Sequence, residues 1–162
     1  MPAYLKFLIK STNQHGVHSP FVFDYLTKCL YKKPKQSRKK VENLVLKSID
    51  YFNYEHIVIF DNPILEDKIY HKSSVTFTDA EPVDVLYFSN MGNNRPNDIF
   101  SNHSLHNQSM LIFADIRSSK ESFTCWTDFI KSDKITVSID FYSCGVAFLR
   151  QEQVKEHFTI RL

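Results

Sequence analysis

The fold of this chain is decided by the stretch LIFADI at residues 111–116, an apolar run that meets the acid Asp115 where a helix is about to begin. Continuous apolar runs of this kind are typical of strands that are covered on both faces in an α/β sheet. In such sheets, ligands bind beyond the carboxyl ends of the strands. The stretch therefore predicts a central strand, with Asp115 as a candidate catalytic residue.

Two further apolar runs predict strands beside it. They are IVIF at residues 57–60 and VDVLYF at residues 83–88. Between the runs, the sequence predicts a short helix over residues 63–70, a short strand over residues 75–78, and a helix from Arg95 or Pro96 to about residue 103. Strands that alternate with helices predict a mainly parallel sheet with helices on both faces.

The first third of the chain shows only helical patterns. Apolar residues at helical spacing predict a first helix over residues 3–9. A second helix is expected to run to about residue 31, with Ser19 as its N-cap and Pro20 in its first turn. A third is expected to begin at Ser37, because an apolar stripe follows it as far as residue 52. The sequence thus predicts helices before the sheet.

The last third predicts one more helix and a hairpin. Ser118 and Glu121 have the spacing of a capping box, which predicts the start of a helix. Strands at residues 135–139 and 146–149, joined by a turn, predict a β-hairpin that puts one antiparallel strand into the sheet. Residues 151–157 are expected to add a last turn of helix.

Composition limits the classes of function. A length of 162 residues with 43% apolar residues fits one domain, with a helical region at residues 1–54 and a sheet region at residues 55–162. The net charge of +2 indicates no general affinity for polyanions. No apolar run approaches the roughly 20 residues that cross a bilayer, and the first ten residues lack a signal-peptide pattern. The sequence predicts a cytoplasmic protein with no membrane contact.

Several standard sites are excluded or disfavoured. The three glycines, Gly16, Gly92 and Gly145, are isolated, so neither GxGxxG nor GxxxxGK[ST] occurs. The three cysteines have no CxxC spacing, which indicates small buried side chains rather than a disulfide framework or a zinc site.

Two histidine pairs have a spacing that can serve a metal. His15 and His18, and likewise His103 and His106, stand three residues apart. The first pair precedes a helix, where packing or capping is the simpler role, and the second pair has no cysteine nearby. We therefore predict no metal site.

Two stretches resemble a known family. The sequence STNQHGVHSPFVF at residues 11–23 is similar to the opening signature of a group of class I S-adenosylmethionine-dependent methyltransferases of Bacteroidetes type. Residues 119–161, with Trp126 on a helix followed by the hairpin and the tail, are similar to the last part of the same group. The resemblance covers about a third of the chain and implies a Rossmann-like domain whose cofactor is S-adenosylmethionine.

The middle of the chain departs from the family pattern. In the family, the first strand ends in an acid followed by a glycine-rich turn. Here Asp61 is followed by Asn62 and Pro63, and proline removes a backbone N–H donor. Residues 61–82 are too few for the helix, strand and second helix that the family has there. The resemblance therefore implies a Rossmann-like sheet with a reduced strand and helix count, in which Asp61 and Asn90 are the remaining cofactor-binding candidates.

The catalytic positions differ as well. Ser89 stands where the family has an acid, and Ala114 stands before Asp115 where the family has two acids. One carboxylate cannot hold Mg²⁺ by itself. The resemblance, with these departures, predicts a degenerate, non-catalytic homologue that has lost the cofactor site and binds no cofactor.

Two alternatives stay open. The first is an active methyltransferase with an atypical S-adenosylmethionine site made of Asp61, Asp115 and the loop from Asn90 to residue 94. The second is a small basic nucleic-acid-binding module that uses the six lysines and arginines of residues 32–40, although such runs are more often solvated and nucleic acid is not the expected partner. A shortened sheet also exposes an edge strand, which a second copy of the chain or an unidentified protein partner would cover.

Overall fold

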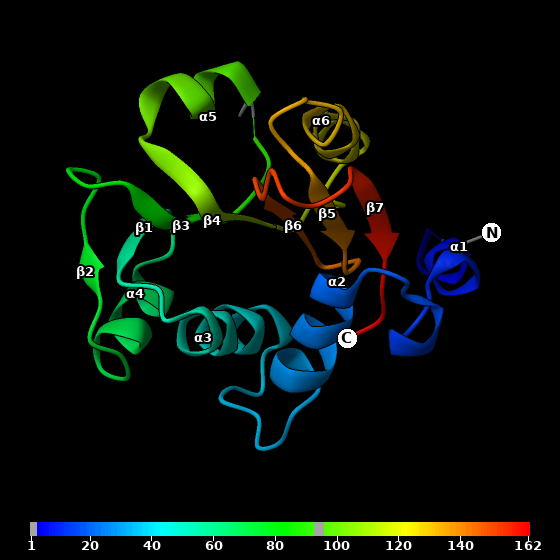
Figure 1. Ribbon diagram of the computed structural model, residues 1–162, viewed down its shortest axis with the longest axis horizontal. Coiled ribbons are helices and arrows are strands. Elements are labelled where there is room, and N and C mark those ends of the chain that lie inside the picture. Colours follow the sequence, from blue (N-terminus) through cyan, green and yellow to red (C-terminus); the bar gives the residue numbers. More distant parts are fainter. Residues whose placement is uncertain (1–2, 93–95) are drawn as a thin grey trace.

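The computed structural model describes residues 3–92 and 96–162, and it confirms the expected α/β fold class. Seven strands form one mixed sheet in the order β2-β1-β3-β4-β6-β5-β7, with helices on both faces (Figure 1). The strands are β1 (His56–Phe60), β2 (Thr76–Phe77), β3 (Val83–Phe88), β4 (Leu105–Ala114), β5 (Val137–Asp140), β6 (Cys144–Phe148) and β7 (Glu156–Thr159). Only β6 runs antiparallel to its neighbours in this described sheet.

Helices precede the sheet and then alternate with its strands. They are α1 (Ala3–Lys10), η1 (Gln14–Gly16), α2 (Pro20–Asp24), η2 (Tyr25–Leu30), α3 (Lys40–Phe52), α4 (Pro63–Tyr70), α5 (Pro96–Asn102) and α6 (Lys120–Phe129). The predicted bounds of α4 and β3 are confirmed. Because α4 and the two-residue β2 are the elements between β1 and β3, this part of the sheet is as short as expected. None of the described helices is long and apolar enough to cross a membrane.

Side chains of β4 alternate between two apolar cores. Met110 and Ile112 pack with the cluster under α2, η2, α3 and α4, whereas Leu111 and Phe113 pack with the cluster under α5 and α6. Alternate residues of a strand point to opposite faces, so an uninterrupted apolar run is required where both faces are covered. The prediction that LIFADI forms a central strand is confirmed, and β4 begins earlier than the apolar run, at Leu105.

The prediction of a helical turn over residues 151–157 is wrong. The segment makes a turn, and residues 156–159 then form β7, which pairs in parallel with β5 from Val137↔Glu156 to Asp140↔Thr159. An edge strand has a row of unpaired N–H and C=O groups. Here β7 pairs with the backbone groups along the edge of β5. This tertiary pairing outweighs the local pattern that favours a helical turn.

Two predicted helix starts are shifted. The third helix begins at Lys40 rather than Ser37, whose hydroxyl instead accepts the N–H of Lys39 at 3.2 Å. The capping residue of α6 is Ser119, which accepts the N–H of Ser122 at 3.0 Å. The hydroxyl of Ser118 instead lies 3.0 Å from that of Ser122, and its N–H donates to the carbonyl of Asp115 in the turn after β4. At α6 two adjacent serines are candidates for the cap, whereas at α3 the N-cap position is Lys39. Pattern alone places a helix start only to within a few residues.

The second helix is continuous but changes its winding. It is α-helical in α2 and π-helical in η2, and the predicted N-cap Ser19 accepts the N–H of Val22 at 3.4 Å. The buried side chain of Lys47 extends from α3 to the end of η2, where its ammonium donates to the carbonyls of Cys29 and Leu30. A cation at this position satisfies carbonyls that the last turn leaves unpaired.

The N-terminal segment is joined to the sheet at β7. The N–H of Thr12 donates to the carbonyl of Thr159 at 2.9 Å, and the N–H of Arg161 donates to the carbonyl of Thr12 at 3.1 Å. These bonds bring α1 to the carboxyl end of β7 (Figure 1). A helix from the start of the chain thereby becomes one wall of a cavity at that end of the sheet.

Candidate functional site

The turn after β1 is closed by side chains of the protein. The hydroxyl of Ser89, which follows β3, lies 2.8 Å from the carbonyl oxygen of Phe60 and 2.9 Å from that of Asp61. The carboxamide of Asn62 accepts the N–H of Leu65 at 3.0 Å and so caps α4, with Pro63 in the first turn. The backbone that follows β1 is thus used to begin the helix α4, and the N–H of Leu65 is already bonded to Asn62.

The candidate residues Asp61 and Asp115 do not come together. Both are exposed and both have a left-handed backbone, with φ of 58° at Asp61 and 49° at Asp115. Asp61 follows β1 and Asp115 follows β4, and β3 lies between them, which separates the two backbones by about 9–10 Å. Asn90 follows β3 and is exposed. The predicted loop continues to residues 93–94, which lie outside the described residues, as does Arg95.

Tyr87, on β3, contacts the turn after β1. Its hydroxyl accepts a hydrogen bond from the carboxamide of Asn62 at 3.3 Å. Burial raises the pKa of the phenol, so it stays protonated and acts as a neutral hydrogen-bonding group. In the described residues, three cavities lie elsewhere on the protein, and neither Asp61, Asn90 nor Asp115 lines any of these three.

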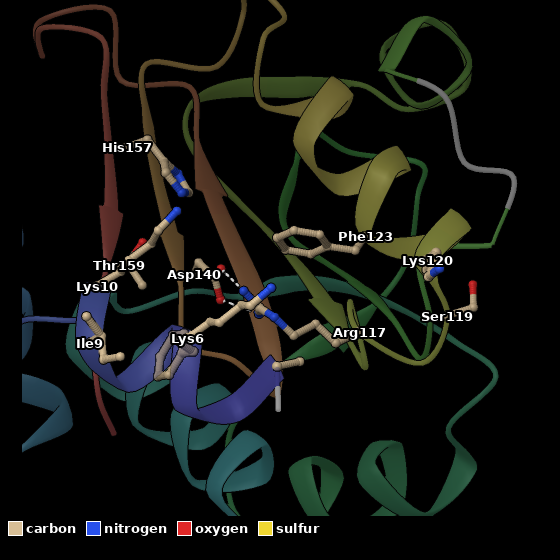
Figure 2. Close-up of a pocket in the computed structure, with 12 residues that line it drawn as sticks. Lys6, Ile9, Lys10, Arg117, Ser119, Lys120, Phe123, Asp140, His157 and Thr159 are labelled. Carbon is tan, nitrogen blue, oxygen red and sulfur yellow. Dashed lines mark hydrogen bonds and ion pairs between the residues drawn. The ribbon is translucent and has the colours of Figure 1, made fainter. Parts of the chain in front are cut away.

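A larger cavity lies at the other half of the sheet. This cavity of about 710 Å³, here called the β7 groove, is bounded by α1, the start of α6 and the strands β5 and β7 (Figure 2). Its lining includes the lysines Lys6, Lys10 and Lys120, together with Arg117 and Asp140. The two smaller cavities have volumes of about 300 and 310 Å³ and lie beside η2 and beside the hairpin turn.

An ion pair between Arg117 and Asp140 lies at the base of the groove. The guanidinium binds both carboxylate oxygens, with Nη1 to Oδ1 at 2.6 Å, and Nη1 also donates to the carbonyl of Tyr142 at 3.1 Å. Aromatic rings surround the guanidinium, with the centroid of Phe123 at 4.4 Å and that of Phe7 at 5.4 Å. Asp140 is buried, so this bidentate pair fixes the turn after β4 to the end of β5.

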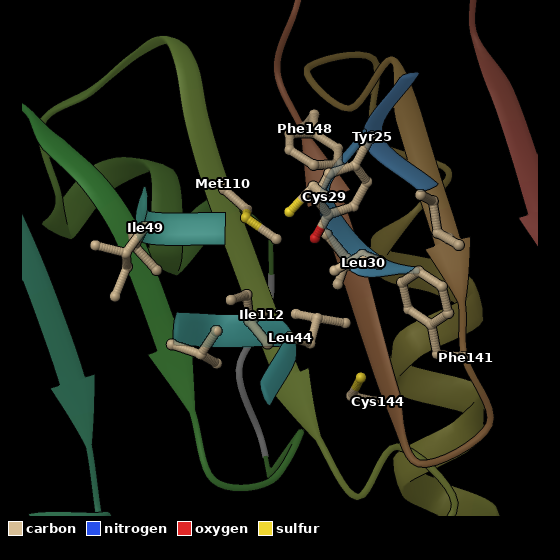
Figure 3. Packing of buried hydrophobic residues seen from close by; sticks show 14 of the residues in the cluster. Tyr25, Cys29, Leu30, Leu44, Ile49, Met110, Ile112, Phe141, Cys144 and Phe148 are labelled. Carbon is tan, nitrogen blue, oxygen red and sulfur yellow. The ribbon is translucent and has the colours of Figure 1, made fainter. Parts of the chain in front are cut away.

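Two of the three cysteines are buried as predicted, and the third is half-buried. Cys29 and Cys144 are buried in the core that contains Tyr25 and Phe148 (Figure 3), and Cys125 is half-buried on α6. Burial raises the pKa of Cys29 and of Cys144 to about 12. A thiol with so high a pKa has almost no thiolate at neutral pH, so neither residue is suited to act as a nucleophile.

The histidine pairs do not gather further ligands. Nε2 of His106 donates to the carboxylate of Asp84 at 2.8 Å, which ties β4 to β3. His15 and His18 are both exposed near the start of α2. Across residues 3–92 and 96–162, no three of the His, Cys, Asp and Glu side chains come close enough to hold a metal ion.

The basic cluster lies on the segment before α3 and at its start. Lys39 pairs with Glu42 at 3.2 Å, and Lys40 donates to the carbonyl of Leu162 at 2.8 Å. Lys32 and Lys33 are at or near the surface and line the smaller cavity beside η2. Part of the cluster is therefore engaged within the protein, and the rest is available to solvent.

Sequence reasoning missed the β7 groove. Two signals were present: Lys6 and Lys10 are one helical turn apart on α1, and Asp140 is an acid at the carboxyl end of a strand. Neither signal indicates that α1 lies against β7, because that contact depends on a strand that was not predicted. Comparison of the chain with protein-family models, curated proteins and solved structures gives no match.

Proposed function

We propose that the chain is a shortened class I methyltransferase-like domain whose S-adenosylmethionine site has been lost, and that it acts by binding a partner rather than by catalysis. The observation that carries this proposal is the closed turn after β1. Ser89 binds the carbonyls of that turn, and Asn62 caps α4 directly behind it. A cofactor at this position would need those backbone groups for itself.

The sheet supports the same proposal. The parallel strands β1, β3 and β4 are followed by the hairpin of β5 and β6, in which β6 lies antiparallel between β4 and β5. The resemblance implies such a hairpin at the end of the domain. The residues that differ from the family are those at the carboxyl ends of β1, β3 and β4, where its ligands would bind.

Calorimetric titration with S-adenosylmethionine tests the proposal. We expect no heat of binding up to millimolar ligand, and no change in the thermal midpoint at 1 mM ligand. An intact site with a dissociation constant near 10 µM would stabilise the protein by about 2.7 kcal/mol at that concentration. A micromolar affinity that Asp61→Ala or Asp115→Ala abolishes would overturn the proposal in favour of an active methyltransferase with an atypical site.

A further inference from the structure

We propose that the β7 groove binds a small anionic molecule that has an apolar body, such as an aromatic phosphate ester or carboxylate. This inference goes beyond the proposed function and does not depend on it, because the groove lies away from the turn after β1 and shares none of its residues. A volume of about 710 Å³ is within the range of small-molecule sites.

The charge of the groove favours an anion. Arg117 is matched by Asp140, but within the described part of the chain Lys6, Lys10 and Lys120 have no carboxylate within 4.0 Å. Lys6 and Lys10 extend from α1 over the groove, Lys6 toward Arg117 and Lys10 toward β7 (Figure 2). Three ammonium groups around one cavity leave an excess of positive charge that a bound anion would balance.

The guanidinium of Arg117 adds fixed donors. Asp140 and the carbonyl of Tyr142 take three of its five N–H groups, and two are left. Because the ion pair and the surrounding rings hold the guanidinium in place, binding an oxygen of the ligand costs little side-chain entropy.

Apolar side chains define the second part of the ligand. Phe7 and Ile9 of α1 and Phe123 of α6 line the same cavity as the lysines. The ring of Phe123 points from α6 into the groove (Figure 2). An inorganic anion would leave these apolar surfaces in contact with water, whereas an aromatic or aliphatic body would cover them.

The sheet face in the groove argues against a helix of another protein as the occupant. On β5 and β7 the residues that alternate toward α6 are polar: Ser138, Asp140, His157 and Thr159. Helices pack on sheets through apolar faces, and here the hydroxyl of Ser138 is already bonded to Nδ1 of His157 at 2.9 Å. A small ligand with one charged end and one apolar end fits this mixture better.

The test uses 1-naphthyl phosphate as the probe in isothermal titration calorimetry with the full chain. We expect saturable binding that weakens with salt, while inorganic phosphate and 1-naphthol, which each carry half of the chemistry, bind at least about tenfold more weakly. Backbone amide shifts in NMR spectra should change at Lys10, Lys120 and Thr159. Absence of binding at 5 mM probe, or shifts confined to other elements, would overturn the proposal.

The triple variant Lys6→Gln/Lys10→Gln/Lys120→Gln assigns the binding to the groove. All three side chains are exposed, so the fold should be retained, and circular dichroism checks this. We expect the affinity for the probe to fall about tenfold or more, since each exposed charge contributes a modest factor. The matched control Lys32→Gln/Lys33→Gln/Lys35→Gln removes the same charge elsewhere and should keep the wild-type affinity. Equal losses in both variants would contradict a site in the groove.

Discussion

The carboxamide of Asn62 and the phenol of Tyr87 lie 3.3 Å apart, and through this contact the turn after β1 is bonded to the neighbouring strand β3. The same carboxamide caps α4 through Leu65. One side chain thus fixes the strand end, the helix start and the phenol behind them. This network stands where the resemblance implies a cofactor-binding turn.

Substitution of Asn62 tests how much this closed turn stabilises the fold. Asn62→Ala removes the cap and the bond to Tyr87, and we expect the free energy of unfolding to fall by about 1–2 kcal/mol. Tyr87→Phe removes only the phenolic contact and should cost about 0.5–1.5 kcal/mol. In a urea-denaturation double-mutant cycle the two effects should not be additive, because the residues share a hydrogen bond. Fully additive effects would show that this bond contributes nothing.

Lys47 offers a second test, of a cation in the core. Its ammonium bonds to the carbonyls at the end of η2, and the residue is 6% exposed. Lys47→Met keeps an unbranched side chain of similar length but removes the ammonium that donates to these carbonyls. We expect the free energy of unfolding to fall by about 1–3 kcal/mol. Lys28→Met, which breaks an exposed pair with Asp24 on the same helix, is the control and should leave the free energy of unfolding almost unchanged. Similar losses in both variants would contradict a structural role for the buried ammonium.

Elements set by local patterns could be predicted from the sequence, whereas the contacts of Asn62 and Lys47 could not. The strand in LIFADI, the bounds of α4 and the proline-led start of α2 follow from local patterns, and all three were found. The cap at Asn62 was not recognised, although asparagine before proline is a common helix start. The role of Lys47 was not visible, because it depends on the distance between two helices.

The groove could not be predicted for a related reason. It forms because Thr12 pairs with the tail beside β7, and residues so far apart in the sequence carry no shared periodic signal. The departures at Asp61, Ser89 and Ala114 were visible in the sequence. The side-chain bonds that close the turn after β1 became visible only in the structure.

Gly145 tests the packing of β6 against α6. A Cβ atom at this position would lie 2.7 Å from ring atoms of Trp126, which is fully buried. Gly145→Ala should therefore overpack the core and lower the free energy of unfolding by about 1–3 kcal/mol in urea denaturation. The smaller ring in Gly145→Ala/Trp126→Phe should recover part of the loss relative to the sum of the single variants. If the double variant costs at least that sum, the close approach is not the cause.

The stability of the fold at low pH should depend on Asp84. Burial opposes ionisation of this residue, but the N–H groups of His56 and Glu55 and the ring of His106 donate to the carboxylate, and together they lower its pKa. A carboxylate whose pKa is lower in the folded than in the unfolded chain stabilises the fold above the ordinary aspartate pKa of about 4. That contribution is lost as the pH falls through the folded value.

Urea denaturation between pH 7 and pH 3 measures this dependence. Asp84→Asn should be less stable than the wild type at pH 7. The difference should begin to shrink below about pH 4, where the carboxylate of the unfolded wild-type chain binds a proton before that of the folded chain does. The control Asp128→Asn removes an exposed pair with Lys131 and should cost less than about 1 kcal/mol at pH 7. A difference between Asp84→Asn and wild type that stays constant down to pH 3 would show that the charge of Asp84 does not contribute, and that its effect comes from packing alone.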